Sequence, residues 1–98
     1  MGRIVAFDIG DKRVGVAVTD PFGNMALPLE TYWRKGFKTD AENLIELAKK
    51  QDAERIVCGL PVNFDGSESM QTAKTREFIE QLKALTEIPI ETQDERFS

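Results

Sequence analysis

The residues that could carry chemistry in this chain are carboxylates. The sequence contains no histidine, which excludes a Ser-His-Asp triad, a histidine-rich zinc site and histidine general-base catalysis. Its one cysteine, Cys58, lies in an apolar run and has no histidine to activate it, so a catalytic thiol is not expected. Two acidic positions stand out instead, Asp8 and the pair Asp94-Glu95.

Asp8 interrupts an apolar run, with Phe7 before it and Ile9 after it. An ionised carboxylate buried in such a run would cost on the order of several kcal/mol unless something pairs with it, because it loses its hydration. We therefore expect a metal ion as its partner. The alternative is that Asp8 hydrogen-bonds the turn at Gly10, since Asx turns are common beside glycine.

Asp8 lies near the tip of a predicted hairpin. The runs 3–9 and 13–19 are rich in valine and isoleucine and are joined by a short connection, which predicts two antiparallel strands. Lys12 and Arg13 make this end of the hairpin positive.

The next segments predict an edge strand and a helix. Gly15, inside the second strand, indicates a bulge or a close approach of another group. Residues 25–32 predict a third strand, which Pro28 places at the edge of the sheet because proline cannot donate to a ladder. Thr39 and Glu42 then fit a capping box at the start of the first helix.

The remaining segments predict a strand, a helix and a last strand. The run 55–60 is apolar on both faces, which is typical of a central parallel strand, an apolar stripe over 69–86 predicts a helix, and 88–93 predicts a last strand. Three strands followed by helix, strand, helix and strand is the ribonuclease H-like order. Right-handed crossovers predict a mixed α/β sheet of order 3-2-1-4-5, with strands 1–3 antiparallel. The backbones at Asp8 and at Asp94-Glu95 would then lie about 10 Å apart, so their side chains could share an ion cluster.

Length and composition predict one domain, residues 1–98. The sequence is 41% hydrophobic and 31% charged, as in soluble globular proteins, and no apolar run approaches the roughly 20 residues of a membrane span. No signal peptide precedes the first strand and no internal disulfide can form, so the expected compartment is the cytoplasm. The net charge of −4 argues against an extended nucleic-acid footprint, although acidic metal ligands can coexist with a local basic rim.

Three motifs occur in order along the chain: Phe7-Asp8-Ile9-Gly10 with Arg13-Val14-Gly15-Val16-Ala17 and Thr19-Asp20; Gly59-Leu60-Pro61 with Asp65-Gly66-Ser67-Glu68; and Asp94-Glu95-Arg96. In order and spacing they resemble the YqgF/RuvX family of bacterial ribonuclease H-fold proteins, which are described as pre-16S rRNA nucleases or Holliday-junction-resolvase-like proteins. Members of that family usually continue through a last helix with a further catalytic aspartate and a basic stretch, whereas this sequence ends at Phe97-Ser98. The resemblance therefore implies a truncated chain whose full activity needs residues that it lacks.

The resemblance implies a metal-dependent phosphodiesterase. Asp8 and Glu95 would be the catalytic residues, and one or two Mg²⁺ or Mn²⁺ ions would activate a water and stabilise the leaving oxygen. The candidate metal ligands are four carboxylates: Asp8, Glu95, Asp94 and Asp65. The candidate phosphate-binding residues are Lys12, Arg13 and Arg96. For these three cations the alternative is ordinary surface charge.

The implied partner is nucleic acid. The first expectation is processing of the 5′ end of precursor 16S rRNA in ribosome biogenesis, and the alternatives are Holliday junction cleavage in DNA recombination and repair or a non-catalytic binding module. An Asp-x-Gly hairpin also opens the phosphate-binding fold of actin, sugar kinases and Hsp70, but 98 residues cannot form both domains of such proteins. A sheet face left bare by truncation would favour self-association of the chain.

Overall fold

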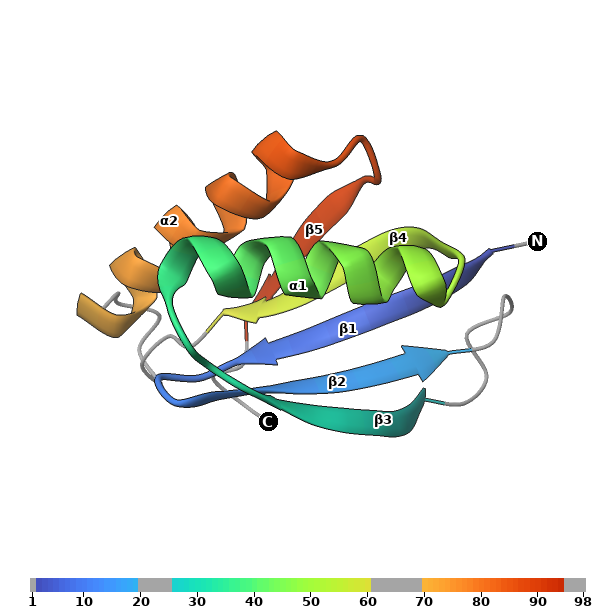
Figure 1. Ribbon diagram of the computed structural model, residues 1–98, viewed down its shortest axis with the longest axis horizontal. Coiled ribbons are helices and arrows are strands. Elements are labelled where there is room, and N and C mark those ends of the chain that lie inside the picture. The colour runs from blue at the N-terminus through green and yellow to red at the C-terminus, as the bar shows by residue number, and fades with distance from the viewer. Residues whose placement is uncertain (1, 20–25, 61–69, 95–98) are drawn as a thin grey trace.

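The computed structural model describes residues 2–19, 26–60 and 70–94 (Figure 1). In chain order the elements are β1 (Arg3–Ile9), β2 (Arg13–Thr19), β3 (Ala26–Trp33), α1 (Phe37–Lys50), β4 (Ala53–Leu60), α2 (Met70–Leu85) and β5 (Ile90–Asp94). The alternating valines and isoleucines of the strands and the amphipathic pattern of the helices account for these elements.

The five strands form one sheet in the order β3-β2-β1-β4-β5. β1 pairs antiparallel with β2 and β2 with β3, whereas β4 is parallel to both β1 and β5. The structure therefore confirms the predicted strand order and places β1 at the centre.

Both helices cover the same face of the sheet, where they contact each other (Figure 1). The core between them and the sheet is one cluster of buried side chains, including Phe7 of β1, Leu44 of α1, and Phe78 and Leu82 of α2. None of the described elements covers the opposite face. We call the two faces of the sheet the covered face and the open face.

The strand β1 divides its side chains between these faces. Val5, Phe7 and Ile9 are buried on the covered face, whereas Asp8 is exposed. The prediction that Asp8 is buried is therefore wrong. Side chains alternate along a strand, so the apolar neighbours of Asp8 point to the covered face while Asp8 itself points to the open one.

The start of α1 also differs from its prediction. The helix begins at Phe37, after Gly36, and no side chain caps it at that position. Thr39 is exposed inside the first turn, so the predicted capping box with Glu42 does not form. The carboxylate of Asp40 instead accepts hydrogen bonds from the backbone amides that lead into the helix.

β3 is an edge strand, as Pro28 predicts. Pro28 pairs with Ala17, and the register of β2 against β3 shifts between Val16 and Ala17. Gly15 pairs regularly with Thr31, so the bulge lies beyond Gly15 and not at it. No helix in the described part of the chain is long and apolar enough to cross a membrane.

Candidate metal and nucleic-acid site

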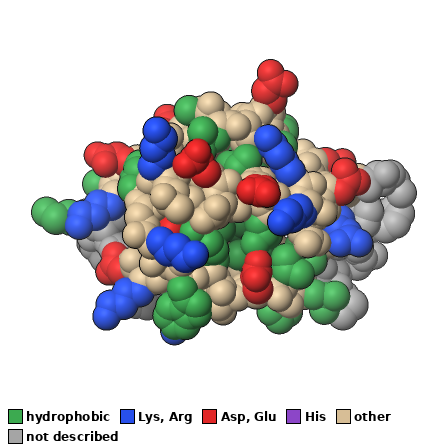
Figure 2. Space-filling model, in the orientation of Figure 1, with side chains coloured by type: hydrophobic (Ala, Val, Ile, Leu, Met, Phe, Trp, Pro, Cys, Tyr) green, Lys and Arg blue, Asp and Glu red, His purple; other side chains and the backbone are tan. Residues whose placement is uncertain are grey.

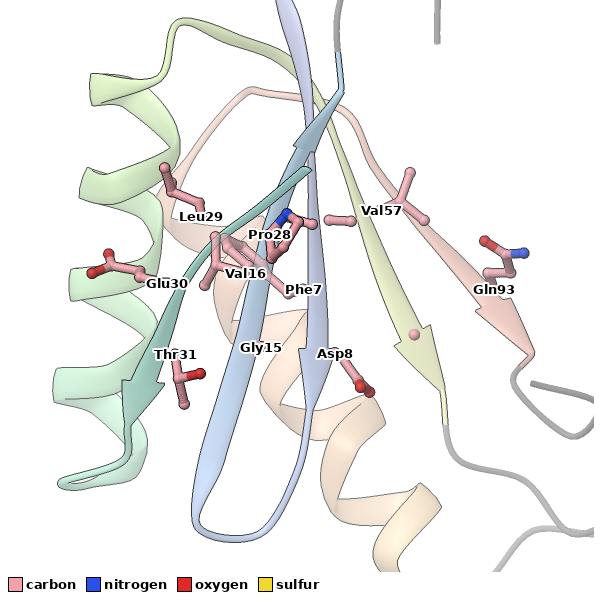
Figure 3. Close-up of a pocket in the computed structure, with 13 residues that line it drawn as sticks. Phe7, Asp8, Gly15, Val16, Pro28, Leu29, Glu30, Thr31, Val57 and Gln93 are labelled. Atoms are coloured by element: carbon pink, nitrogen blue, oxygen red, sulfur yellow. The ribbon is translucent and has the colours of Figure 1, made fainter. Parts of the chain in front are cut away.

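Asp8 lies in a row of paired residues that crosses the whole sheet. Gly15 of β2 and Gly59 of β4 are its partners on either side, and Thr31 of β3 and Gln93 of β5 extend the row to the two edges. We call these five residues the Asp8 row. Figure 3 shows the Asp8 carboxylate with Thr31 and Gly15 on one side and Gln93 on the other.

The Asp8 row crosses an open hollow of about 410 Å³ on the open face of the sheet. Its lining includes Ala6, Ala17 and Val57, and Pro28 and Leu29 of the edge strand. Figure 3 shows Val57 on one side of β1 and Pro28 and Leu29 on the other. This surface is mainly apolar, and the only carboxylates among its described lining residues are Asp8 and Glu30.

Two glycines keep the Asp8 carboxylate accessible. Neither Gly15 nor Gly59 has a side chain to cover it, although both pair directly with Asp8. A Cβ atom added to Gly15 would lie 3.5 Å from the Cβ of Asp8, which is an ordinary contact. A longer side chain at Gly15 would therefore lie beside the carboxylate and restrict access to it.

The Asp8 carboxylate fits a hard divalent cation as one ligand. It is exposed, and no hydrogen bond or ion pair to it occurs within residues 2–19, 26–60 and 70–94. Carboxylate oxygens are the donors that Mg²⁺ and Mn²⁺ prefer. The described residues include no group of three or more acidic, cysteine or histidine side chains that could hold a metal, so the residues that the structure describes do not form a complete metal site by themselves.

The other predicted ligands cannot be placed. Asp65, Glu95 and the phosphate-binding candidate Arg96 lie outside the described residues. Asp94 ends β5 and its backbone pairs with Leu60, one step beyond the Asp8 row, but its side chain is not described. The shared ion cluster of Asp8 with Asp94-Glu95 stays a prediction.

Lys12 and Arg13 are exposed at the β1–β2 turn, which we call the hairpin end of the sheet. Arg13 pairs with Trp33 of β3, and its guanidinium lies 5.9 Å from the centre of the indole ring. Lys12 and Arg13 thus lie at the same end of the sheet as Asp8, as the sequence predicts.

A partly buried network that the sequence did not predict fixes the hairpin end. Arg34 donates from its guanidinium to the carbonyl oxygen of Gly10 at 2.9 Å, and its backbone amide donates to the carbonyl of Lys12 at 2.9 Å. The same guanidinium donates to Asp40 at 3.1 Å and lies 4.6 Å from the ring centre of Phe78. Arg34 therefore ties the turn after Asp8 to both helices.

Asp40 is the other half of this network. Only 1% of it is exposed, and its carboxylate accepts hydrogen bonds from Tyr32 Oη at 2.9 Å, from the Lys35 amide at 2.8 Å and from the Gly36 amide at 3.3 Å. Burial alone raises the pKa of Asp40, but these bonds and the Arg34 guanidinium outweigh it, so its pKa lies below the ordinary value. No local sequence signal marks this pairing, because it joins a strand end to a helix.

Comparison with known proteins identifies the family. A family model described as "RuvX: Holliday junction resolvase" matches residues 2–98. The chain belongs to the RuvX family. A similar protein from Rhodopseudomonas palustris (strain BisA53), named "Putative pre-16S rRNA nuclease", is 45% identical over 97 residues, which cover 99% of this chain and 60% of the relative. The chain thus spans about 60% of the length of the curated RuvX relatives that it matches.

Solved structures place this RuvX chain in the ribonuclease H-like fold class. T. thermophilus RuvC, solved in complex with Holliday junction substrate, matches 96% of this chain and 65% of its own, with a TM-score of 0.65 and 11% identity. Archaeoglobus fulgidus Pelota matches 96% of this chain and 27% of its own, with a TM-score of 0.64 and 15% identity. At these identities the likeness shows the fold alone.

Proposed function

We propose that this chain contributes the Asp8 side of the active site of a metal-dependent nuclease that hydrolyses phosphodiester bonds in structured nucleic acid. The observation that carries the proposal is the exposed carboxylate of Asp8 on the central strand of a RuvX-family sheet, between two glycines and with no partner among the described residues. A structural aspartate of this chain, Asp40, has the opposite environment.

Phosphodiester hydrolysis needs an activated water and neutralisation of the charge that develops on the phosphate. A bound Mg²⁺ or Mn²⁺ ion supplies both. Asp8 would hold the cation at the open face, and the exposed Lys12 and Arg13 would bind the phosphates next to the scissile bond and so position the strand. The remaining proposed ligands are Glu95, Asp94 and Asp65, and the remaining proposed phosphate contact is Arg96.

The proposed substrate is the 5′ end of precursor 16S rRNA. Two curated relatives, at 45% and 43% identity, carry the name of a pre-16S rRNA nuclease. The description of the family model favours a second candidate, cleavage of Holliday junctions. Both are structured nucleic acids with a phosphodiester backbone, so they call for the same chemistry at Asp8.

A chimera tests the proposal at full length. Residues 1–98 replace the matching segment of the R. palustris relative, and the product is incubated with precursor 16S rRNA or a four-way DNA junction in Mg²⁺ or Mn²⁺. We expect the chimera to cleave one substrate and D8N to lower its rate at least about 100-fold, since the lost ligand acts at the reacting phosphate. E91Q is the matched control, because Glu91 is an exposed carboxylate of β5 that pairs with Arg55 at 3.6 Å. Binding of nucleic acid without metal-dependent cleavage would instead support the non-catalytic module.

A further inference from the structure

Trp33 is exposed at the hairpin end without an evident structural role. It is the only tryptophan of the chain and the last residue of β3, and 60% of it is exposed. The guanidinium of its cross-strand partner Arg13 lies 5.9 Å from the ring centre. This pair presents an aromatic ring with a cation over it on the surface.

The ring of Trp33 belongs to the same face of the sheet as Asp8. Arg13 is two residues from Gly15 in β2, so both point to the same face, and Gly15 is the direct partner of Asp8. Trp33 pairs with Arg13 and therefore shares that face. With strands about 4.8 Å apart and about 3.4 Å per residue, Trp33 lies about 10 Å across and about 7 Å along the sheet from Asp8.

The surface between Asp8 and the edge strand is low along the Asp8 row. The Asp8 row crosses it with Thr31 and Gly15, a small residue and a glycine. The hollow of about 410 Å³ continues beside them (Figure 3). A polymer that reaches the Asp8 carboxylate can therefore continue over the sheet to Trp33 without meeting a large side chain of the row.

The backbone on both sides of Trp33 is held in place. Tyr32 donates its hydroxyl hydrogen bond to Asp40 and accepts one from Asn43 at 2.9 Å. The Arg34 amide and guanidinium are bound to the carbonyls of Lys12 and Gly10. These anchors lie on the covered face, so the backbone that carries the exposed ring is fixed and little backbone entropy remains to be lost on binding.

The charges around Trp33 suit a polyanion. Lys12, Arg13 and Lys35 are exposed at the hairpin end, and Asp11 is the acidic exception among the exposed residues there. Figure 2, which views the molecule from the side of the helices, shows basic, acidic and apolar side chains interspersed on that face. An aromatic ring within a basic surface is the usual arrangement for contact with unpaired nucleotides, in which the base stacks and the phosphate pairs with the cation.

We propose that Trp33 and Arg13 form a stacking platform for an unpaired base of the strand whose phosphate lies at Asp8. The inference rests on the proposed function for the position of the scissile phosphate, and it adds that the substrate is single-stranded beside the cleavage point. Arg13 holds the neighbouring phosphate, while Trp33 supplies the apolar face on which the base stacks. Because every base has a flat face, this platform selects strand state and not sequence.

The single tryptophan makes the test direct, because all indole fluorescence comes from Trp33. Short oligo-U and oligo-dT are titrated into the 98-residue chain in EDTA, so that no cleavage is involved. We expect strong quenching by both single strands, weakening as salt rises, and little quenching by a blunt duplex of equal length. Quenching by the duplex equal to that by the single strands would overturn the proposal.

Variants measured by anisotropy of a labelled oligonucleotide complete the test. W33A should weaken single-strand binding about tenfold and W33F much less, since stacking survives in phenylalanine. L27A and K50Q are the controls: Leu27 is an exposed apolar residue of the same strand, and Lys50 is an exposed cation at the far end of α1. Equal binding by W33A and the wild-type chain, or an equal loss in L27A, would refute the platform. A loss of dimer on sedimentation of W33A would show that Trp33 instead faces a second copy.

The two proposals fail separately. Quenching in EDTA together with a chimera that never cleaves would leave the platform standing and remove the nuclease. A chimera that cleaves at the wild-type rate when it carries W33A would leave the nuclease standing and remove the platform.

Discussion

Asp40 and Asp8 are two aspartates on opposite faces of one sheet. Asp40 is 1% exposed and accepts hydrogen bonds from Arg34, Tyr32 and two backbone amides. Asp8 is exposed and has no such partner among the described residues. The hydrogen-bond donors of this region thus bind Asp40, which holds the hairpin end. The Asp8 carboxylate is left without a partner among the described residues. A carboxylate left free at a fixed position is what a metal site requires.

The largest expected effect comes from removing the structural aspartate. D40A leaves Arg34, Tyr32 and two amides without their common acceptor, and breaking a buried ion pair in this way should lower the free energy of unfolding by about 3–5 kcal/mol. Urea denaturation followed by far-UV circular dichroism measures this. E42A, at an exposed carboxylate of the same helix, is the control, and equal stability of D40A and E42A would show that the Asp40 network is not formed.

Lowering the pH should remove the stabilisation that the Asp40 carboxylate provides more gradually. The pKa of Asp40 is lower in the folded chain than its value of about 3.9 in an unfolded chain. As the pH falls, Asp40 is therefore protonated first in the unfolded chain. The stabilisation by the Asp40 carboxylate is complete above about pH 5, and it is lost as the pH falls through the pKa of Asp40 in the folded chain. D40N cannot titrate, so the stability difference between wild type and D40N should shrink between about pH 5 and pH 2. A difference that stays constant over this range would contradict the lowered pKa.

The sequence predicted the features that depend on residues close together in the chain, and it missed those that depend on residues brought together by the fold. Strand order followed from local patterns and crossover handedness, and the position of Asp8 at the hairpin end followed from the hairpin. The burial of Asp8 was predicted wrongly, because its apolar neighbours Phe7 and Ile9 point to the opposite face of β1. The contact of Arg34 with Asp40 was not predicted, since a strand end and a helix meet only through the tertiary fold.

A smaller effect should follow from covering Asp8. G15V places a branched side chain beside the Asp8 carboxylate. Valine suits a strand, so the fold should persist. We expect Mn²⁺ binding to weaken about tenfold, which is about 1.4 kcal/mol. G15A adds only a Cβ atom at an ordinary contact distance and should bind Mn²⁺ nearly as the wild type does. Isothermal titration of both variants tests this, and unchanged affinity in G15V would place the metal elsewhere.

The smallest effect is expected for D8N on stability. The side chain keeps its shape, is exposed and gives up no contact with the described residues. The free energy of unfolding should stay within about 0.5 kcal/mol of wild type, as at ordinary surface positions, and it should rise if other carboxylates converge on Asp8. A loss as large as that expected for D40A would make Asp8 a structural turn residue.

The most direct test of the central claim is a Mn²⁺ titration of the 98-residue chain and of D8N, followed by paramagnetic broadening of the backbone amide signals. In the wild-type chain we expect the amides of Asp8, Gly15 and Gly59 to broaden first and those of α1 to broaden only at higher Mn²⁺. In D8N this early broadening should disappear, while E91Q should behave as the wild type does. Equal broadening of the Asp8 row in D8N would contradict the assignment of Asp8 as a metal ligand.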